Sequence, residues 1–204
     1  MMRITRIEPV TKTKYRVSVD EQFAFVVYKG ELSRFHLKEE CELTEDTYAK
    51  IKEVLLKRAK LRAMHLLNDM ARTESQFRDK LKLGGYPSEI TEAAIAYVKS
   101  FGYINDDAYI RNFIDSRKDK KSRREIYALL RQKGVDMNRA EEIMEEMYEE
   151  HSDQEAIREL LRKKHWDFAC TDPKEKQKIY GYLVRKGFRY EDIRQVIQVC
   201  DWNA

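Results

Sequence analysis

Three glycines, each at the end of the same apolar pattern, constrain the fold of this chain more than any other feature. Each glycine follows a leucine by four residues and a phenylalanine or isoleucine by eight, and an apolar residue comes directly after it. The glycines are Gly85, Gly134 and Gly187, and the leucines are Leu81, Leu130 and Leu183. A glycine that ends a helix adopts the left-handed C-cap conformation at little cost, and the apolar residue after it packs back on the helix. The pattern predicts a helix, a glycine turn and a second helix, repeated along the chain.

Each predicted helix pair is preceded by a further stretch with helical periodicity, so each repeat should contain three helices. The glycines lie 49 and 53 residues apart, which leaves room for three short helices and their turns. The additional helices are expected at residues 61–71, 106–117 and 153–164. A unit of this size buries little apolar surface by itself, and stacked neighbours bury more. We therefore expect three tandem three-helix repeats in an elongated, curved array.

The N-terminal residues have a different, strand-like pattern. Apolar and polar residues alternate over 15–19, and residues 23–28 form an apolar run rich in aromatic and β-branched side chains. This is typical of a β-hairpin, and a third strand is expected at 3–8. Such a small sheet is marginally stable alone and should pack on the helices that follow. Thr44 is a good N-cap for a long helix that runs to about Met70.

Glycine and proline are scarce, at 7 and 3 residues, so the chain has little material for the many tight turns of an all-β fold. We predict a predominantly all-α protein with a small N-terminal β-hairpin region. The predicted parts are a strand region at 1–43, a long helix with the first repeat at 44–104, the second repeat at 105–152 and the third repeat at 153–204.

Composition indicates a globular protein of the cytoplasm. Hydrophobic residues make up 42% and charged residues 37% of the chain, which is typical of helices with solvated faces. No stretch approaches the ~20 apolar residues that span a bilayer, and the N-terminus lacks the apolar run of a signal peptide. Cys41, Cys170 and Cys200 are widely spaced without a Cys-x-x-Cys. They are interpreted as reduced thiols, because neither a disulfide framework nor a zinc site has this spacing.

The residues do not form a recognisable catalytic constellation. Gly84 and Gly85 are followed by Tyr86 and Pro87 rather than by the Lys-Ser/Thr of a phosphate-binding loop. The four histidines have no partner at the i, i+4 spacing that metal sites on helices use. We therefore predict no metal, no cofactor and no enzymatic activity, and expect the protein to bind another macromolecule.

The charged residues are clustered, although the net charge is only +4. Residues 50–62 contain six Lys or Arg and one acid, whereas residues 136–150 contain seven acids and one arginine. The candidate contact residues in the first cluster are Lys57, Arg58 and Lys60. Separate basic and acidic faces suit docking onto a partner of mixed charge, and solvated helix faces are the alternative interpretation.

The most basic segment, residues 116–124, is predicted to be a loop between the first two helices of the central repeat. It contains no apolar residue, and its Ser122 forms a predicted capping box with Glu125 for the second helix. Its six cations are Arg117, Lys118, Lys120, Lys121, Arg123 and Arg124. The segment is either a solvated connection or a contact with phosphates or with an acidic protein groove.

Three stretches of this chain resemble the RecX family. Residues 97–117 are similar to the family signature around Gly-Tyr/Leu-Leu-Asn/Asp-Asp, and residues 129–135 to its Leu-x-x-Lys-Gly-Ile/Val turn. Residues 72–81 resemble its Arg-x-x-Ser-x-x-Glu-Leu-x-x-Lys-Leu stretch, with Gln76-Phe77 where Glu-Leu is usual. The basic segment also departs from the family, which often has glycine there. The resemblance covers roughly residues 59–200.

The resemblance implies a modulator of RecA that lies in the groove of the RecA filament on DNA and suppresses its ATPase and strand exchange. Any ATP would then belong to the partner. A monomer is expected, with the RecA filament as its partner, a direct DNA contact as an additional one, and no membrane.

Two other functions compete with this interpretation. The helical turns resemble helix-turn-helix units, so the chain could be a stand-alone DNA- or RNA-binding module. Such modules usually place cations on one recognition helix, whereas the helix after Gly134 is acidic. An enzyme that uses carboxylates of the central repeat is the other alternative, and it lacks a convergent base, nucleophile or metal set.

Overall fold

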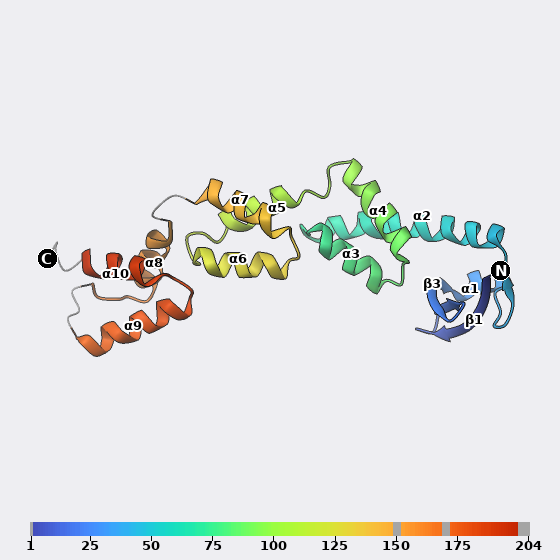
Figure 1. Ribbon diagram of the computed structural model, residues 1–204, viewed down its shortest axis with the longest axis horizontal. Helices are drawn as coiled ribbons and strands as arrows, with labels where there is room; N and C mark the ends of the chain where they lie inside the picture. The colour runs from blue at the N-terminus through green and yellow to red at the C-terminus, as the bar shows by residue number, and fades with distance from the viewer. Residues whose placement is uncertain (1, 149–151, 169–171, 200–204) are drawn as a thin grey trace. The chain divides into compact units, whose positions relative to one another are not determined.

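The protein is described by a computed structural model that covers residues 2–148, 152–168 and 172–199 (Figure 1). The chain divides into two compact units, Met1–Asn105 and Asp106–Ala204. The helical repeats and the strand region are confirmed, and each unit is described by itself below. Cys170 and Cys200 lie outside the described residues, whereas Cys41 is an exposed free thiol.

The first unit begins with a four-stranded antiparallel sheet of order β3-β2-β1-β4. Its strands are β1 (Met2–Pro9), β2 (Lys14–Val19), β3 (Gln22–Tyr28) and β4 (Glu42–Leu43). Asp20 and Glu21 both have positive φ, 49° and 65°, which is the conformation of a two-residue turn that matches the twist of a hairpin. The hairpin and the third strand are therefore confirmed. Strand β4 and a short helix, α1 (Lys29–Arg34), were not predicted.

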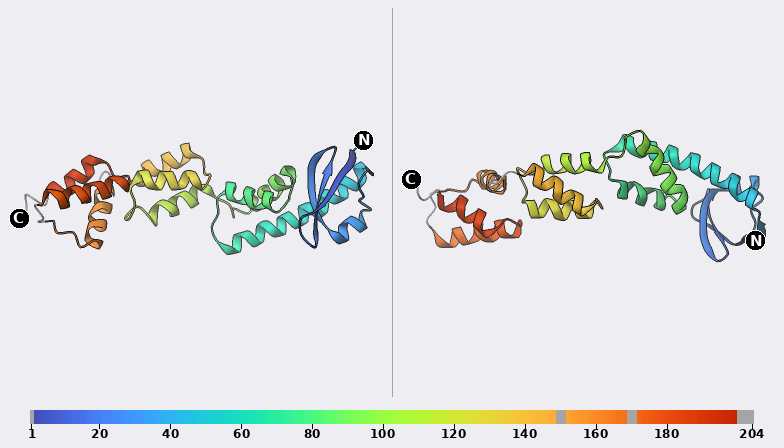
Figure 2. Two further views of the ribbon diagram at one scale, coloured as in Figure 1. Left: turned by 90° about the horizontal axis from the view of Figure 1, so that it is seen from below. Right: turned by 45° about the horizontal axis from the view of Figure 1, so that its top comes forward.

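Three further helices complete the first unit, and Figure 2 shows the ribbon from two other sides. They are α2 (Glu45–Asp69), α3 (Glu74–Leu83) and α4 (Ser88–Ser100). The Thr44 side chain accepts a hydrogen bond from the Thr47 N–H, so α2 has the expected N-cap. The sheet packs on the first half of α2, where Phe25 stacks on Tyr48 with ring centroids 6.0 Å apart. The second half of α2 with α3 and α4 forms the first three-helix repeat.

The second unit contains two further three-helix repeats, each with an apolar core of its own. The second repeat comprises α5 (Asp106–Asp115), α6 (Arg123–Gln132) and α7 (Met137–Met147). The third repeat comprises α8 (Ser152–Lys163), α9 (Pro173–Arg185) and α10 (Tyr190–Val199). Asp172 caps α9 and Pro173 is its first residue, an arrangement that suits the fixed φ and the missing N–H of proline.

The three glycines of the repeat pattern have the left-handed backbone. Their φ values are 82° at Gly85, 72° at Gly134 and 89° at Gly187. The N–H of the residue after the glycine bonds back to the carbonyl of the pattern's leucine in two of the turns, from Tyr86 to Leu81 at 3.4 Å and from Phe188 to Leu183 at 3.3 Å. This is the Schellman arrangement, which satisfies carbonyls at the helix end.

Candidate macromolecule-binding site

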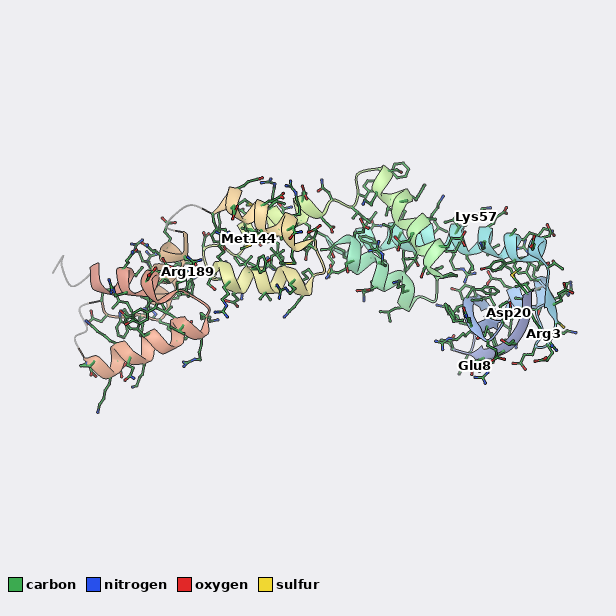
Figure 3. The ribbon with its side chains drawn as sticks, in the orientation of Figure 1. Arg3, Glu8, Asp20, Lys57, Met144 and Arg189 are labelled. Carbon is green, nitrogen blue, oxygen red and sulfur yellow. The ribbon has the colours of Figure 1, made fainter. Side chains whose placement is uncertain are left out.

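A pocket of about 530 Å³ lies between the second and third repeats, inside the second unit. Two of its arginines come from the first turn of α6, and a third comes just before α10, where Figure 3 labels it. These are Arg123, Arg124 and Arg189, and they define what we call the arginine pocket. Its other charged lining residues are Glu141, Asp153 and Asp192. The pocket therefore presents both signs of charge.

Ser122 positions the first turn of α6 against the third repeat. Its side chain is fully buried. Its oxygen accepts a hydrogen bond from the Glu125 N–H at 3.2 Å, and its hydroxyl donates to the Lys186 carbonyl at 2.8 Å. The N-cap of α6 is thus also a cap for the end of α9. One side chain joins the two repeats.

Only half of the predicted capping box forms at this helix. The serine side of the box is present, but the Glu125 carboxylate forms an ion pair with Lys121 instead of returning to the Ser122 N–H. The other oxygen of Glu125 is buried and has no hydrogen-bond partner among the described residues. The N-terminus of α6 is completed instead from the third repeat.

Asp153, in the first turn of α8, provides that completion. Its carboxylate accepts a hydrogen bond from the Arg123 N–H at 3.0 Å. Burial raises the pKa of Asp153, while this N–H and the nearby Arg189 and Arg123 oppose the rise. An internal carboxylate therefore already occupies the first backbone N–H of α6, which disfavours a ligand anion there and leaves the arginine side chains as the candidate contacts.

The arginine side chains differ in how far the protein itself engages them. The Arg123 guanidinium lies 5.8 Å from the centroid of the Tyr148 ring and 3.9 Å from a Glu145 carboxylate oxygen. Arg124 and Arg189 are exposed. Neither forms an ion pair with any residue in the described part of the chain. These two guanidinium groups can reach a partner without breaking an ion pair of the described residues.

The predicted basic loop is shorter than expected, which corrects its boundary. Arg123 and Arg124 belong to α6, because Ser122 ends the loop by capping the helix. The remaining residues form tight turns, in which the N–H groups of Lys120 and Lys121 both bond to the Arg117 carbonyl. The segment is therefore a compact turn followed by the first turn of a helix.

Three cations of this segment contact other residues of the same repeat. The Arg117 guanidinium stacks on the Phe113 ring at 3.8 Å and donates to the Phe113 carbonyl at 3.3 Å. Lys118 pairs with Asp115 at 3.1 Å, and Lys121 pairs with Glu125. Lys120 is exposed and has no ion-pair partner among the residues that the structure describes. Of the six predicted contact residues in this segment, Lys120 and Arg124 have the fewest partners among the described residues.

The other predicted contact residues, Lys57, Arg58 and Lys60, lie on α2 in the first unit, where Figure 3 labels Lys57. Arg58 pairs with Glu31 at 2.5 Å, and both side chains are mostly buried. Its guanidinium also lies 4.5 Å from the Tyr28 ring centroid. Arg58 thus holds α1 and β3 to α2. Lys57 is exposed, and the Lys60 ammonium lies over an aromatic ring of α4.

Arg189 is a site residue that sequence reasoning missed. It lies two positions after Gly187, so the repeat pattern predicts it at the start of a helix. The pattern does not indicate that it lies beside the same pocket as Arg124. The charged residues of the acidic helix α7 also form ion pairs within the second repeat, which the sequence did not indicate. Arg139 binds Asp107 at 2.7 Å and Glu142 at 2.6 Å, and this contact lowers the pKa of Asp107. Glu146, an acid of α7, also pairs with Arg111 of α5, so part of the acidic face holds α7 to α5.

The described residues contain neither a metal-ligand cluster nor a membrane-spanning helix. Within 2–148, 152–168 and 172–199, no three His, Cys, Asp or Glu side chains come together as metal ligands. No helix in the same ranges combines the length and apolarity needed to cross a bilayer.

Comparisons with known proteins identify the family. Two family models match, the first three-helix domain of RecX at residues 59–97 and the third at residues 152–197. The regulatory protein RecX of Caldanaerobacter subterraneus subsp. tengcongensis is 32% identical over 201 residues, covering 97% of this chain and 100% of the relative. That of Clostridium botulinum is 28% identical, covering 97% and 96%.

Solved structures agree with the sequence matches. A crystal structure of a regulatory protein RecX matches with a TM-score of 0.60 and 25% identity, covering 97% of this chain and 99% of that one. The RecX structure from Lactobacillus salivarius shares the fold, with a TM-score of 0.61, 22% identity and coverage of 74% and 99%. With the repeats, their glycine turns and full-length relatives in agreement, this chain belongs to the RecX family of regulatory proteins.

Proposed function

We propose that this protein regulates RecA by binding the RecA filament on DNA in the filament groove, and that it lowers RecA ATPase activity and strand exchange. It does so as a cytoplasmic monomer with no catalysis of its own, and any ATP is hydrolysed by RecA. The family supports a regulatory role, and the resemblance to RecA modulators supports the choice of partner. The arginine pocket is the surface we assign to the contact.

The observation that carries this assignment is the exposure of Arg124 and Arg189 beside the same pocket, from two different repeats. A guanidinium binds a carboxylate or a phosphate through two parallel hydrogen bonds, and these charge-assisted bonds are among the strong ones. Because Ser122 joins the two repeats, the separation of the arginines is set before a partner arrives. Such preorganisation reduces the entropy lost on binding.

The acids of the pocket favour a protein surface over bare DNA as the main ligand. Glu141, Asp153 and Asp192 line the same pocket as the arginines. A uniform polyanion would be repelled by these carboxylates, whereas a protein groove of mixed charge can complement both signs. This disfavours the stand-alone DNA- or RNA-binding module, although a contact with DNA phosphates next to the groove remains part of the proposal.

The proposal is tested with the double variant Arg124→Gln/Arg189→Gln. We expect the concentration that half-inhibits RecA ATPase on single-stranded DNA to rise about tenfold or more, since each lost charge-assisted bond costs about 1.5–3 kcal/mol. In a salt titration, the dependence of inhibition on salt should also become shallower.

The matched control is Lys118→Gln/Lys121→Gln, which removes two neighbouring cations that already have partners inside the second repeat. The control should inhibit RecA nearly as well as the wild type. Superimposable curves for the arginine variant and the wild type would remove the arginine pocket from the contact. A wild-type protein that leaves RecA ATPase unchanged at every concentration would contradict the proposed function itself.

A further inference from the structure

Aromatic side chains are exposed where α4 ends in the first unit. Phe101 and Tyr103 are each 54% exposed, and their rings are stacked with centroids 5.7 Å apart and an interplanar angle of 24°. The Tyr97 ring meets Phe101 edge-on at 5.1 Å. We call these three residues the aromatic platform. Large aromatic side chains at this exposure leave apolar area in water that proteins usually bury or use for binding.

The backbone holds the aromatic platform in place. Gly102, between the two exposed rings, has a left-handed φ of 72°. Its N–H bonds to the Lys99 carbonyl at 2.8 Å, and the Tyr103 N–H bonds to the Val98 carbonyl at 3.3 Å. Val98 and the next residue after the turn, Ile104, are both buried in the core. The rings therefore project from an anchored turn, and a ligand would not have to order them.

Cations extend from the platform along α2. The Lys60 ammonium lies 4.3 Å from the centroid of the Tyr97 ring. Lys57, one helical turn earlier and on the same face, lines a second pocket of about 400 Å³. Arg34 and Lys50 line this pocket as well. A basic track thus leads from the aromatic rings to a basic pocket within one compact unit.

Acidic residues are absent from the two stretches of sequence that carry these side chains. Residues 54–68 of α2 and residues 93–105 of α4 and its turn contain no Asp or Glu, although 36 of the 204 residues are acidic. Glu53 is the acid that lines the basic pocket. This segregation differs from the arginine pocket, which both acids and arginines line, and it favours a polyanion as the ligand.

We propose that this face of the first unit binds single-stranded DNA. Bases stack on Phe101 and Tyr103, and the phosphates follow Lys60 and Lys57 toward the basic pocket at Arg34. Stacked aromatic rings beside a positively charged track are the features by which proteins bind single strands without reading sequence. The bases of a duplex are already paired and stacked, so the platform selects single strands. This inference does not rest on the proposed regulation of RecA.

The test uses the full-length protein, without RecA, and fluorescence anisotropy with three labelled probes. The probes are a short oligothymidylate, an abasic oligonucleotide of the same length and a duplex. For Phe101→Ala/Tyr103→Ala we expect oligothymidylate affinity to fall about tenfold or more, in line with about 1–3 kcal/mol per stacked base. Affinity for the abasic probe should be unchanged, and Phe101→Tyr/Tyr103→Phe should bind like the wild type.

Arg34→Gln/Lys57→Gln should weaken binding of the oligothymidylate and the abasic probe alike and should make the salt dependence shallower. The matched control is Phe23→Ala, which removes an exposed aromatic residue on β3, 49% exposed, beside Arg16. It should bind like the wild type. A 2-aminopurine base in the probe should be quenched by the wild type and not by Phe101→Ala/Tyr103→Ala.

Three results would overturn the inference. The first is equal wild-type affinity for the abasic probe and the oligothymidylate, and the second is equal affinity for duplex and single strand. The third is a platform variant that keeps its affinity for single-stranded DNA but loses inhibition of RecA, which would assign the rings to a protein contact. Loss of inhibition by the arginine-pocket variant alone concerns only the proposed function, because that variant retains the platform.

Discussion

The hydroxyl of Ser122 donates a hydrogen bond to the carbonyl of Lys186, 2.8 Å away, across the join between the second and third repeats. The same oxygen accepts the Glu125 N–H at the start of α6. Because Ser122 is fully buried, water cannot replace either bond without entering the join. The two arginines that we assign to RecA binding come from the two repeats that this bond joins, so the stability of the join and the affinity for the partner should be linked.

Ser122→Ala should lower the free energy of unfolding by about 1–2 kcal/mol, because it removes a helix cap and leaves the Lys186 carbonyl without this donor. Thr44→Ala is the matched control, since Thr44 caps α2 through local bonds only. Urea unfolding should show the larger loss for Ser122→Ala. Equal losses would mean that the bond to Lys186 contributes little.

A second prediction compares two glycines with similar backbone conformations. A Cβ at Gly187 would lie 2.8 Å from the Ser122 hydroxyl oxygen, whereas a Cβ at Gly102 would meet no atom within 4 Å. Gly102→Ala should therefore cost about 1 kcal/mol, the strain of a left-handed backbone alone. Gly187→Ala should cost more, because the join must also open. Thermal unfolding of both variants checks this, and a smaller loss for Gly187→Ala would contradict it.

A third prediction concerns acid. Arg78 bonds to Glu92 at 2.7 Å and to Glu74 at 2.9 Å, and Lys99 also bonds to Glu74. The bonds from Lys99 and Arg78 lower the pKa of Glu74 below its usual 4.5, and Arg78 lowers that of Glu92. Carboxyl groups with lowered pKa values in the folded state contribute stability above their unfolded pKa, and this contribution is lost as pH falls through the folded pKa.

Arg78→Met should therefore destabilise the protein at pH 7, by no more than about 1 kcal/mol because the groups are partly solvated. The difference from the wild type should shrink as pH falls from about 5 toward 3 and both carboxyl groups become protonated. Lys50→Met is the control, since its pair with Asp46 is well exposed. A stability difference for Arg78→Met that stays constant over this pH range would contradict the assignment.

A fourth prediction concerns Tyr148, whose hydroxyl is buried beside the arginine pocket without a hydrogen-bond partner among the described residues. Burial raises the pKa of this phenol well above its usual value. Removing an unpaired buried hydroxyl while keeping the ring should not destabilise the protein, and it can stabilise it. Tyr148→Phe should unfold at the same or a higher urea concentration than the wild type. A clear loss of stability would show that the hydroxyl is hydrogen-bonded.

The helical part of the fold could be predicted because its signals are local. A glycine four residues after a leucine places a left-handed turn, and residues such as Thr44 and Asp172 place helix starts. Gln76, which departs from the family pattern, still caps its helix as a glutamate would. Its side chain accepts a hydrogen bond from the Thr73 N–H at 3.2 Å and completes a capping box.

The candidate sites could be predicted only in part, because they depend on contacts between distant residues. Arg124 and Arg189 line the same pocket because two repeats meet there. The Ser122–Lys186 bond that joins these repeats links residues 64 positions apart in the sequence. The sequence does not distinguish Arg117 from the other cations of its segment, whereas in the structure its guanidinium stacks on the Phe113 ring. The sequence does not indicate that Phe101 is exposed either, because large aromatic residues are usually buried.

Gly85 joins two structural requirements at one position. It ends α3 in the left-handed conformation, and its carbonyl accepts the Val26 N–H at 3.2 Å, so that strand β3 rests directly on the turn. A Cβ at this position would run into the Val26 side chain. Any side chain here would therefore push the sheet away as well as strain the helix end, and no substitution could relieve one effect alone. In evolution, the strand region and the first repeat are thus constrained to change together.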